Sequence, residues 1–248
     1  MIRIRGLRKK LGVKQVLDGV DLDIPTGCTM VVLGRSGTGK SVLLKHVIGL
    51  MQPDAGSIEV DGEPITGLDE RDLNEIRKRF GMLFQSGALF DSLTVGENIA
   101  LPLREHTRLA RAEIAHRVTE RLDWVGLQGV EDMKPSSLSG GMRKRVALAR
   151  AIAMDPAYIL YDEPTTGLDP IMSDVINRLI RSLQQRIGVT SIVVTHDLRS
   201  AMFVGDRLAM LHDGRVVFTG TPSEAHETNN ELVRQFIEGN SESAAGAV

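Results

Sequence analysis

Apolar and polar residues alternate along the first part of the chain, a pattern typical of β-strands that bury one face. The alternation runs over residues 2–7 and returns over residues 16–24. We expect two antiparallel strands here, near an edge of the fold. A further small hairpin is predicted over residues 53–65, because Asp61-Gly62 is a favoured hairpin turn.

A second pattern combines short, continuous apolar runs with helical periodicity. MVVL (30–33), YILY (158–161) and SIVV (191–194) indicate strands buried on both faces. A helix is predicted to begin at Asp169, with Pro170 at its first position. Because strand and helix units alternate, we expect a parallel sheet.

Residues 86–155 differ from both patterns, because β-branched runs disappear and helical periodicity takes over. We interpret this stretch as an inserted helical subdomain. The predicted fold class is α/β, with a P-loop NTPase parallel-sheet core, an antiparallel β edge subdomain and an inserted α-helical subdomain. The expected division is a single domain over 1–239, with a core of about 1–85 and 156–239, a helical subdomain of about 86–155, and a flexible tail over 240–248.

Composition narrows the choice of partners. The chain has 30 Lys and Arg residues against 32 Asp and Glu, a net charge of -2, so no strong field attracts nucleic acid. Cys28 is the only cysteine, which excludes an intramolecular disulfide and fits a reducing compartment. No secretory signal follows the first residues, and no apolar run reaches the ~20 residues that span a bilayer. We therefore expect any membrane role to need partner subunits.

A glycine-rich loop lies between the predicted buried strand and a helix. GRSGTGKS (34–41) matches the pattern in which backbone N–H groups surround phosphates at a helix N-terminus. Lys40 is expected to reach the terminal phosphates and Ser41 to bind Mg²⁺. The loop predicts nucleoside triphosphate binding without choosing among a kinase, a GTPase and a transport ATPase. The expected binding set is Gly34, Arg35, Ser36, Gly37, Thr38, Gly39, Lys40, Ser41 and Val42.

Two carboxylates follow the apolar run YILY. Asp162 is expected to hold the Mg²⁺ shell, and Glu163 to orient or deprotonate the attacking water. Burial beside a strand should affect Glu163, since a carboxylate desolvated near phosphate becomes easier to protonate. The alternative is a strand that ends in solvated acidic residues.

The segment LSGGM (138–142) precedes a predicted helix. Ser139, Gly140 and Gly141 offer a hydroxyl and bare N–H groups at a positive helix end, which predicts a second anion site. One chain has no need of two phosphate sites unless this one faces the nucleotide of a second copy. Taken alone, the segment is more often a turn.

Three single residues are weaker candidates. His196 follows the SIVV strand, where it could donate to the γ-phosphate, although a lone histidine is usually structural. Gln85 has an amide that could contact Mg²⁺ or water. Asp169 suits a helix N-cap, a role compatible with a functional one.

Taken in order, these motifs resemble the Walker A, Q-loop, signature, Walker B, D-loop and H-loop motifs of ATP-binding cassette ATPases, over about residues 2–238. The resemblance implies ATP hydrolysis with Mg²⁺ and a head-to-tail homodimer, in which Ser139 and Gly141 close on the ATP held by Lys40 of the other copy. It also implies a cytoplasmic subunit, peripheral on the inner membrane, whose closure is transmitted through Gln85 and the helical subdomain to integral membrane permease subunits. The implied sites are catalytic (Lys40, Glu163 and His196), metal-binding (Ser41, Gln85 and Asp162) and, besides the loop, nucleotide-binding (Gln85, Ser139, Gly140, Gly141, Asp162 and Asp169).

Two positions depart from the family pattern. Met142 stands where the signature commonly has Gln, which predicts weakened rather than abolished activity. Leu11 stands where an aromatic residue commonly stacks on adenine, which puts base selectivity in doubt.

Residues 82–107 and 135–153 are more narrowly similar to the ATPase of Mla-type transporters. The resemblance implies phospholipid transport between bacterial membranes, with MCE-domain proteins and small accessory proteins as further partners. Leu89 and Phe90 could contact a permease helix or pack inside the helical subdomain.

Three alternatives remain open at this point. The chain could serve an importer or exporter of another substrate. It could act on DNA or ribosomes, although it has neither the long coiled coil nor the second cassette typical of those proteins. It could also sense nucleotide without turnover, which the altered signature and the missing aromatic would favour.

Overall fold

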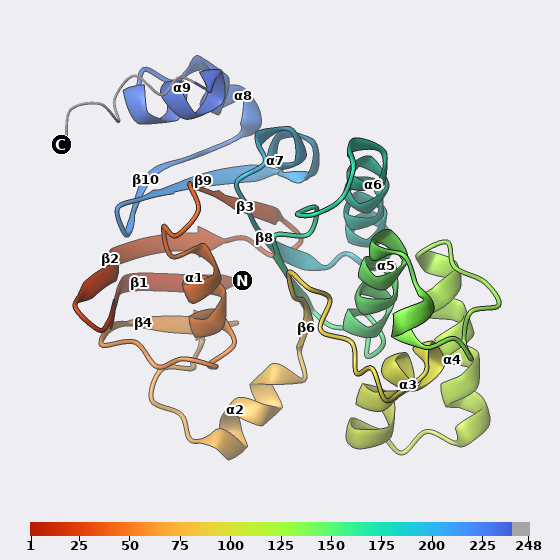
Figure 1. Ribbon diagram of the computed structural model, residues 1–248. Coiled ribbons are helices and arrows are strands. Elements are labelled where there is room, and N and C mark those ends of the chain that lie inside the picture. The colour runs from red at the N-terminus through yellow and green to blue at the C-terminus, as the bar shows by residue number, and fades with distance from the viewer. Residues whose placement is uncertain (240–248) are drawn as a thin grey trace.

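The computed structural model describes residues 1–239, and the tail expected over residues 240–248 lies outside this part. Two sheets form the body of the molecule (Figure 1). The smaller sheet has the order β2-β1-β4-β5 and the larger β10-β9-β3-β8-β7-β6. The strands are β1 Ile2–Leu11, β2 Lys14–Ile24, β3 Thr29–Leu33, β4 Ala55–Val60, β5 Glu63–Pro64, β6 Phe80–Leu83, β7 Tyr158–Asp162, β8 Thr190–Thr195, β9 Arg207–His212 and β10 Arg215–Gly220.

The smaller sheet is antiparallel throughout, as its alternating pattern predicts. Ile2, Ile4 and Leu7 on β1 are fully buried, while the polar residues between them face outward. The expected hairpin over residues 53–65 is confirmed as β4 and β5. This sheet therefore has one face on the core and one on solvent.

In the larger sheet five strands are parallel, and β10 closes one edge antiparallel to β9. Side chains of β3 alternate between the two faces. Val32 packs with helix α1 and the antiparallel sheet, whereas Val31 packs with helices α5 to α7. Both faces are thus covered, which explains why these strands are continuously apolar.

Helices cover the larger sheet and form a separate group beside it (Figure 1). Helix α3 lies within the stretch 86–155 that was expected to be helical, and Thr94 and Glu97 form a capping box at its start. Pro102 lies inside this helix and weakens its sequence signal. No helix within residues 1–239 combines the length and apolar character needed to cross a membrane. The helices are α1 Lys40–Val47, α2 Glu70–Arg77, α3 Val95–His106, α4 Arg111–Trp124, α5 Gly140–Ala151, α6 Pro170–Ile187, α7 Leu198–Val204, α8 Pro222–Glu227 and α9 Glu231–Glu238, with a 3-10 turn at Pro135–Ser137.

The parallel strands β3, β8, β7 and β6 are neighbours, and their carboxyl ends share one edge of the sheet. The phosphate-binding loop follows β3, and His196 follows β8 directly. Glu163 follows β7, and Gln85 lies two residues beyond β6. Because ligands of open α/β folds bind at this edge, the topology gathers four separate motifs in one place.

Candidate functional site

The loop over residues 34–41 owes its shape to glycine. Gly37 and Gly39 have φ angles of 78° and 102°, which side chains rarely adopt. A Cβ on Gly34 would lie 2.6 Å from the backbone oxygen of Leu211. Helix α1 begins at Lys40, and no side chain caps its first N–H groups. The loop therefore presents backbone donors at a positive helix end.

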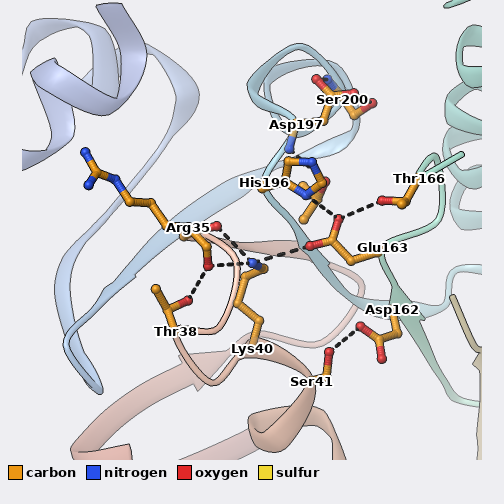
Figure 2. Close-up of polar contacts among 12 residues, drawn as sticks. Arg35, Thr38, Lys40, Ser41, Asp162, Glu163, Thr166, His196, Asp197 and Ser200 are labelled. Carbon is orange, nitrogen blue, oxygen red and sulfur yellow. Dashed lines mark hydrogen bonds and ion pairs between the residues drawn. The ribbon is translucent and has the colours of Figure 1, made fainter. Parts of the chain in front are cut away.

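Lys40 is 5% exposed and points back across the loop (Figure 2). Its Nζ donates to the backbone oxygens of Gly34 at 2.8 Å and Arg35 at 3.1 Å. The same atom lies 3.3 Å from Glu163 Oε1. The loop and the end of β7 are thereby joined by a buried ion pair.

Ser41 and Asp162 form a second link between the same two elements. Ser41 Oγ donates to Asp162 Oδ1 at 2.7 Å (Figure 2). Asp162 is 8% exposed at the end of β7. A hydroxyl and a carboxylate at this separation are oxygen ligands of the kind that Mg²⁺ prefers.

Glu163 is held from three directions. Its Oε2 lies 2.9 Å from His196 Nδ1 and accepts from Thr166 Oγ1 at 3.2 Å. Burial is the largest single influence on the pKa of this carboxyl and raises it, but His196 and Lys40 together outweigh burial and lower the pKa. Burial thus acts in the expected direction, and the hydrogen bond with His196 and the charge of Lys40 oppose it. Easier protonation of Glu163 near bound phosphate stays a prediction.

Apart from Asp162, these side chains border a cavity of about 580 Å³. Gln85 lines it from the loop after β6, and Leu11 lines it from the end of β1. Leu11 is 43% exposed, so its side chain is available to a ligand. The remaining lining residues are Lys14, Val16, Ser36, Gly37, Gly39, Lys40, Ser41, Val42, Glu163, Thr166 and His196.

Several expected site residues do not line this cavity. Gly34, Arg35 and Thr38 shape the loop, and Thr38 Oγ1 donates to Arg35 O at 2.9 Å. Asp162 lies behind the lining and reaches the site through Ser41. Among the described residues, Ser139, Gly140, Gly141 and Asp169 also lie outside the lining set.

Ser139 and Asp169 each cap a helix. Ser139 Oγ accepts from the N–H of Met142 at the start of α5, and Asp169 accepts from Ile171 and Met172 at the start of α6. Ser139 is exposed. Its position fits the hypothesis of a site that faces another molecule.

Sequence reasoning missed Thr166, Lys14 and Val16. Thr166 bonds the Glu163 carboxylate, and Lys14 Nζ donates to Gly37 O at 3.4 Å. Thr166 lies three residues after Glu163, which was a usable signal. Lys14 and Val16 come from β2, and only the tertiary fold brings this strand to the loop.

Comparison with known proteins decides the family. A family model described as "ABC transporter" matches residues 17–166, which is more than half of the chain. The chain belongs to the ABC transporter family. It is accordingly an ATP-binding cassette ATPase, and its nucleotide-binding loop and α/β fold are those of that family.

This cassette is 46% identical to the "Probable ribonucleotide transport ATP-binding protein mkl" of Mycobacterium leprae, over 96% of the chain and 69% of that protein. It is 42% identical to the "Intermembrane phospholipid transport system ATP-binding protein MlaF" of Haemophilus influenzae, over 98% of the chain and 92% of that protein. The alignment with the mkl proteins of Mycobacterium bovis and Mycobacterium tuberculosis covers 66% of the length of those proteins.

Among solved structures, the cassette superposes on a dimeric post-hydrolysis state of the ATP-binding cassette MJ0796 bound to ADP and Pi. The TM-score is 0.83 at 35% identity, covering 90% of this chain and 99% of that one. The likeness extends over both sheets and the helical group, so the fold prediction is confirmed.

Proposed function

We propose that this cassette hydrolyses MgATP between two copies of itself and thereby drives phospholipid transport through a separate permease. The observation that carries the proposal is the placement of Glu163 between Lys40 and His196 at the mouth of the phosphate loop. A carboxylate there can accept a proton from water and stays ionised, because the hydrogen bond with His196 and the charge of Lys40 lower its pKa.

Mg²⁺ fits the residues at this point. Ser41 Oγ and Asp162 Oδ1 already lie 2.7 Å apart, and the Gln85 amide borders the same cavity. These three residues would hold the ion, with Asp162 acting directly or through water. When bound, Mg²⁺ supplies charge neutralisation for the β- and γ-phosphates.

The protein's own groups would then divide the work. Lys40 and the backbone N–H groups of residues 36–41 bind the terminal phosphates, and Val42 continues the helix behind them. Glu163 orients the attacking water and takes its proton, while His196 fixes the carboxylate and donates toward the γ-phosphate. Thr166 holds the second side of the carboxylate.

The exposed start of α5 supports the second half of the site. Ser139, Gly140 and Gly141 carry free donors at a helix end, and they do not border their own chain's cavity. In a head-to-tail dimer they would close on the ATP of the other copy, with Asp169 near the same interface. The dimeric state of the similar cassette MJ0796 favours this arrangement.

The apolar groove beside α3 suits a permease contact. A cavity of about 690 Å³ is bordered there by Phe84, Phe90 and Pro102, among others. Phe90 is 53% exposed, whereas Leu89 packs against the core. Exposure for a permease contact therefore applies to Phe90, and packing inside the protein applies to Leu89. We propose that Phe90 contacts the permease, which would hold the cassette at the cytoplasmic face of the inner membrane, and that residues 86–155 act as one helical unit in this contact.

Similarity to MlaF supports phospholipid as the cargo, with an MCE-domain protein and small accessory proteins as further partners. Similarity to mkl favours a second candidate, ribonucleotide transport. Purification of the native complex separates the two. We expect a multispanning permease with bound phospholipid, detected by mass spectrometry of the extracted lipids. A permease that carries nucleotide, sugar or peptide instead would overturn the lipid proposal while leaving the ATPase proposal intact.

A further inference from the structure

A buried lysine connects the helix that begins at Ser139 to the candidate catalytic carboxylate. Lys144 lies on α5 and is 6% exposed. Its Nζ donates to the backbone oxygen of Glu163 at 3.2 Å. Its neighbour Arg145 is directed elsewhere and donates to the backbone oxygen of Gly126 at 2.9 Å. Two adjacent cations on one helix thus hold two different segments.

Burial of the Lys144 ammonium is unfavourable unless other groups compensate for it. Desolvation lowers the pKa of Lys144, and the negative charges of Asp162 and Glu163 counteract that effect. The compensation for this buried cation therefore comes from the two residues that the proposed mechanism uses most directly. A lysine that served packing alone would not need to place its Nζ at the backbone oxygen of Glu163.

The backbone of Glu163 also needs support. Its φ angle is 48°, in the left-handed region that non-glycine residues seldom adopt. Such a conformation persists only when the surroundings hold it. The Glu163 N–H donates to Val194 O at 2.9 Å, and its carbonyl accepts from the Thr166 N–H at 3.2 Å as well as from Lys144. Lys144 is the support that arrives from outside the turn and the sheet.

The start of α5 is seated closely against the protein. A Cβ on Gly141 would lie 2.4 Å from Met172 Cε, so the helix packs directly on the first turn of α6. Ser139 and Lys144 are five residues apart, little more than one helical turn. A displacement at Ser139 therefore reaches Lys144 through a continuous helix.

We propose that Lys144 is a positioning residue, which holds the left-handed backbone of Glu163 so that its carboxylate stays aimed between Lys40 and His196. It contacts neither nucleotide nor water in this role. The inference rests on the proposed function, and it adds a link from the signature helix of one chain to the carboxylate of the same chain. Lys144 thereby joins the contact made with the partner's ATP to the chemistry at the chain's own site.

The test compares four variants of the full chain, assembled with its permease. Lys144→Met removes charge and donor at similar length, whereas Lys144→Gln keeps a donor without charge. Arg145→Met is the matched control on the same helix. We expect Lys144→Met to lower kcat roughly 10- to 100-fold, the scale of a small misplacement at a catalytic group. The KM for ATP should stay within about twofold, because no nucleotide contact is lost.

Partial recovery of kcat by Lys144→Gln would support the hydrogen bond to the Glu163 carbonyl as the working contact. Arg145→Met should retain kcat. A Lys144→Met kcat equal to that of Arg145→Met overturns the inference, as does a raised KM with kcat unchanged. Thermal melting and ATP binding of each variant distinguish a folding defect from a catalytic one. If Lys144→Met and Lys144→Gln both melt early and both lose ATP binding, a specific positioning role is contradicted.

The fourth variant, Glu163→Gln, separates this inference from the proposed function. If Glu163→Gln turns ATP over normally, the proposed function fails. If Glu163→Gln is inactive while Lys144→Met is normal, only the role of Lys144 fails.

Discussion

The phosphate loop and the signature segment occupy very different settings in one chain. Lys40 and Glu163 are buried, paired and held at the shared edge of parallel strands. Ser139 and Gly140 are exposed at the start of α5 and border no part of the same cavity. Folding of a single chain therefore assembles the first half of the machinery. The second half is presented to solvent, where only another molecule can use it.

The largest effect is expected from a change in the half of the site that one chain assembles, which contains Lys40 and Glu163. Glu163→Gln keeps the size and the hydrogen bond from Thr166 but cannot take a proton. We expect turnover to fall about 10²- to 10⁴-fold, the usual contribution of a general base, while MgATP binding persists. Phosphate release and equilibrium nucleotide binding measure the two quantities.

Glu59→Gln on β4 is a suitable control for this change, because its carboxylate lies in an exposed ion pair with Arg3. Its turnover should match that of the unmodified chain. Normal turnover by Glu163→Gln would remove Glu163 from the chemistry and end the proposed mechanism.

The next prediction uses mixed dimers to test the exposed half of the site, which contains Ser139 and Gly140. Lys40→Met removes the phosphate contact, and Ser139→Glu directs a carboxylate at the partner's phosphates. Each variant alone should be inactive. In a purified heterodimer of the two, both defects fall in one composite site and the other site is intact. We expect activity at least about tenfold above either parent, because a lost phosphate stabiliser costs 10²–10³.

The matched control places both substitutions in one chain and pairs it with the unmodified chain. Each composite site then carries one defect, so activity should stay near background. The opposite pattern, an active control and an inactive first heterodimer, would mean that Ser139 serves the site of its own chain. Tandem affinity tags on the two copies make both heterodimers separable.

The contrast between the two halves also explains what the sequence could predict. The buried strands, the glycine loop and the Asp169 cap were all visible, because each depends on local pattern. The start of α3 was not located within the expected helical stretch, although the capping box at Thr94 is a local signal, because Pro102 inside the helix weakens the sequence pattern.

Contacts between segments that are distant in the sequence could not be predicted from local sequence patterns. Lys144 meets Glu163 only when α5 packs beside β7, and Val16 reaches the loop only through the placement of β2. The balance of influences on the Glu163 pKa has the same origin. Burial follows from an apolar run, whereas the opposing groups come from other segments, His196 from the loop after β8 and Lys40 from the start of α1.

A smaller effect is expected at the adenine end of the assembled half. Leu11 borders the cavity without an aromatic face. Leu11→Trp should tighten ATP binding about fivefold, since base stacking is worth ~1 kcal/mol or more. Val13→Trp is the control, because Val13 is fully exposed and does not border the cavity. Titration calorimetry compares the two. Equal affinities would show that the base lies elsewhere.

The smallest effect is expected at Met142, in the exposed half. Its side chain packs against the core, and its N–H donates to Ser139 Oγ, the helix cap, at 3.2 Å. Met142→Gln leaves this cap intact and adds one amide near the partner's nucleotide. A single hydrogen bond at a solvated edge is worth about 0.5 kcal/mol, the lower end of the usual range, so kcat should rise by about twofold. A tenfold rise would mean that methionine restrains the site, and a fall would mean that its packing positions Ser139.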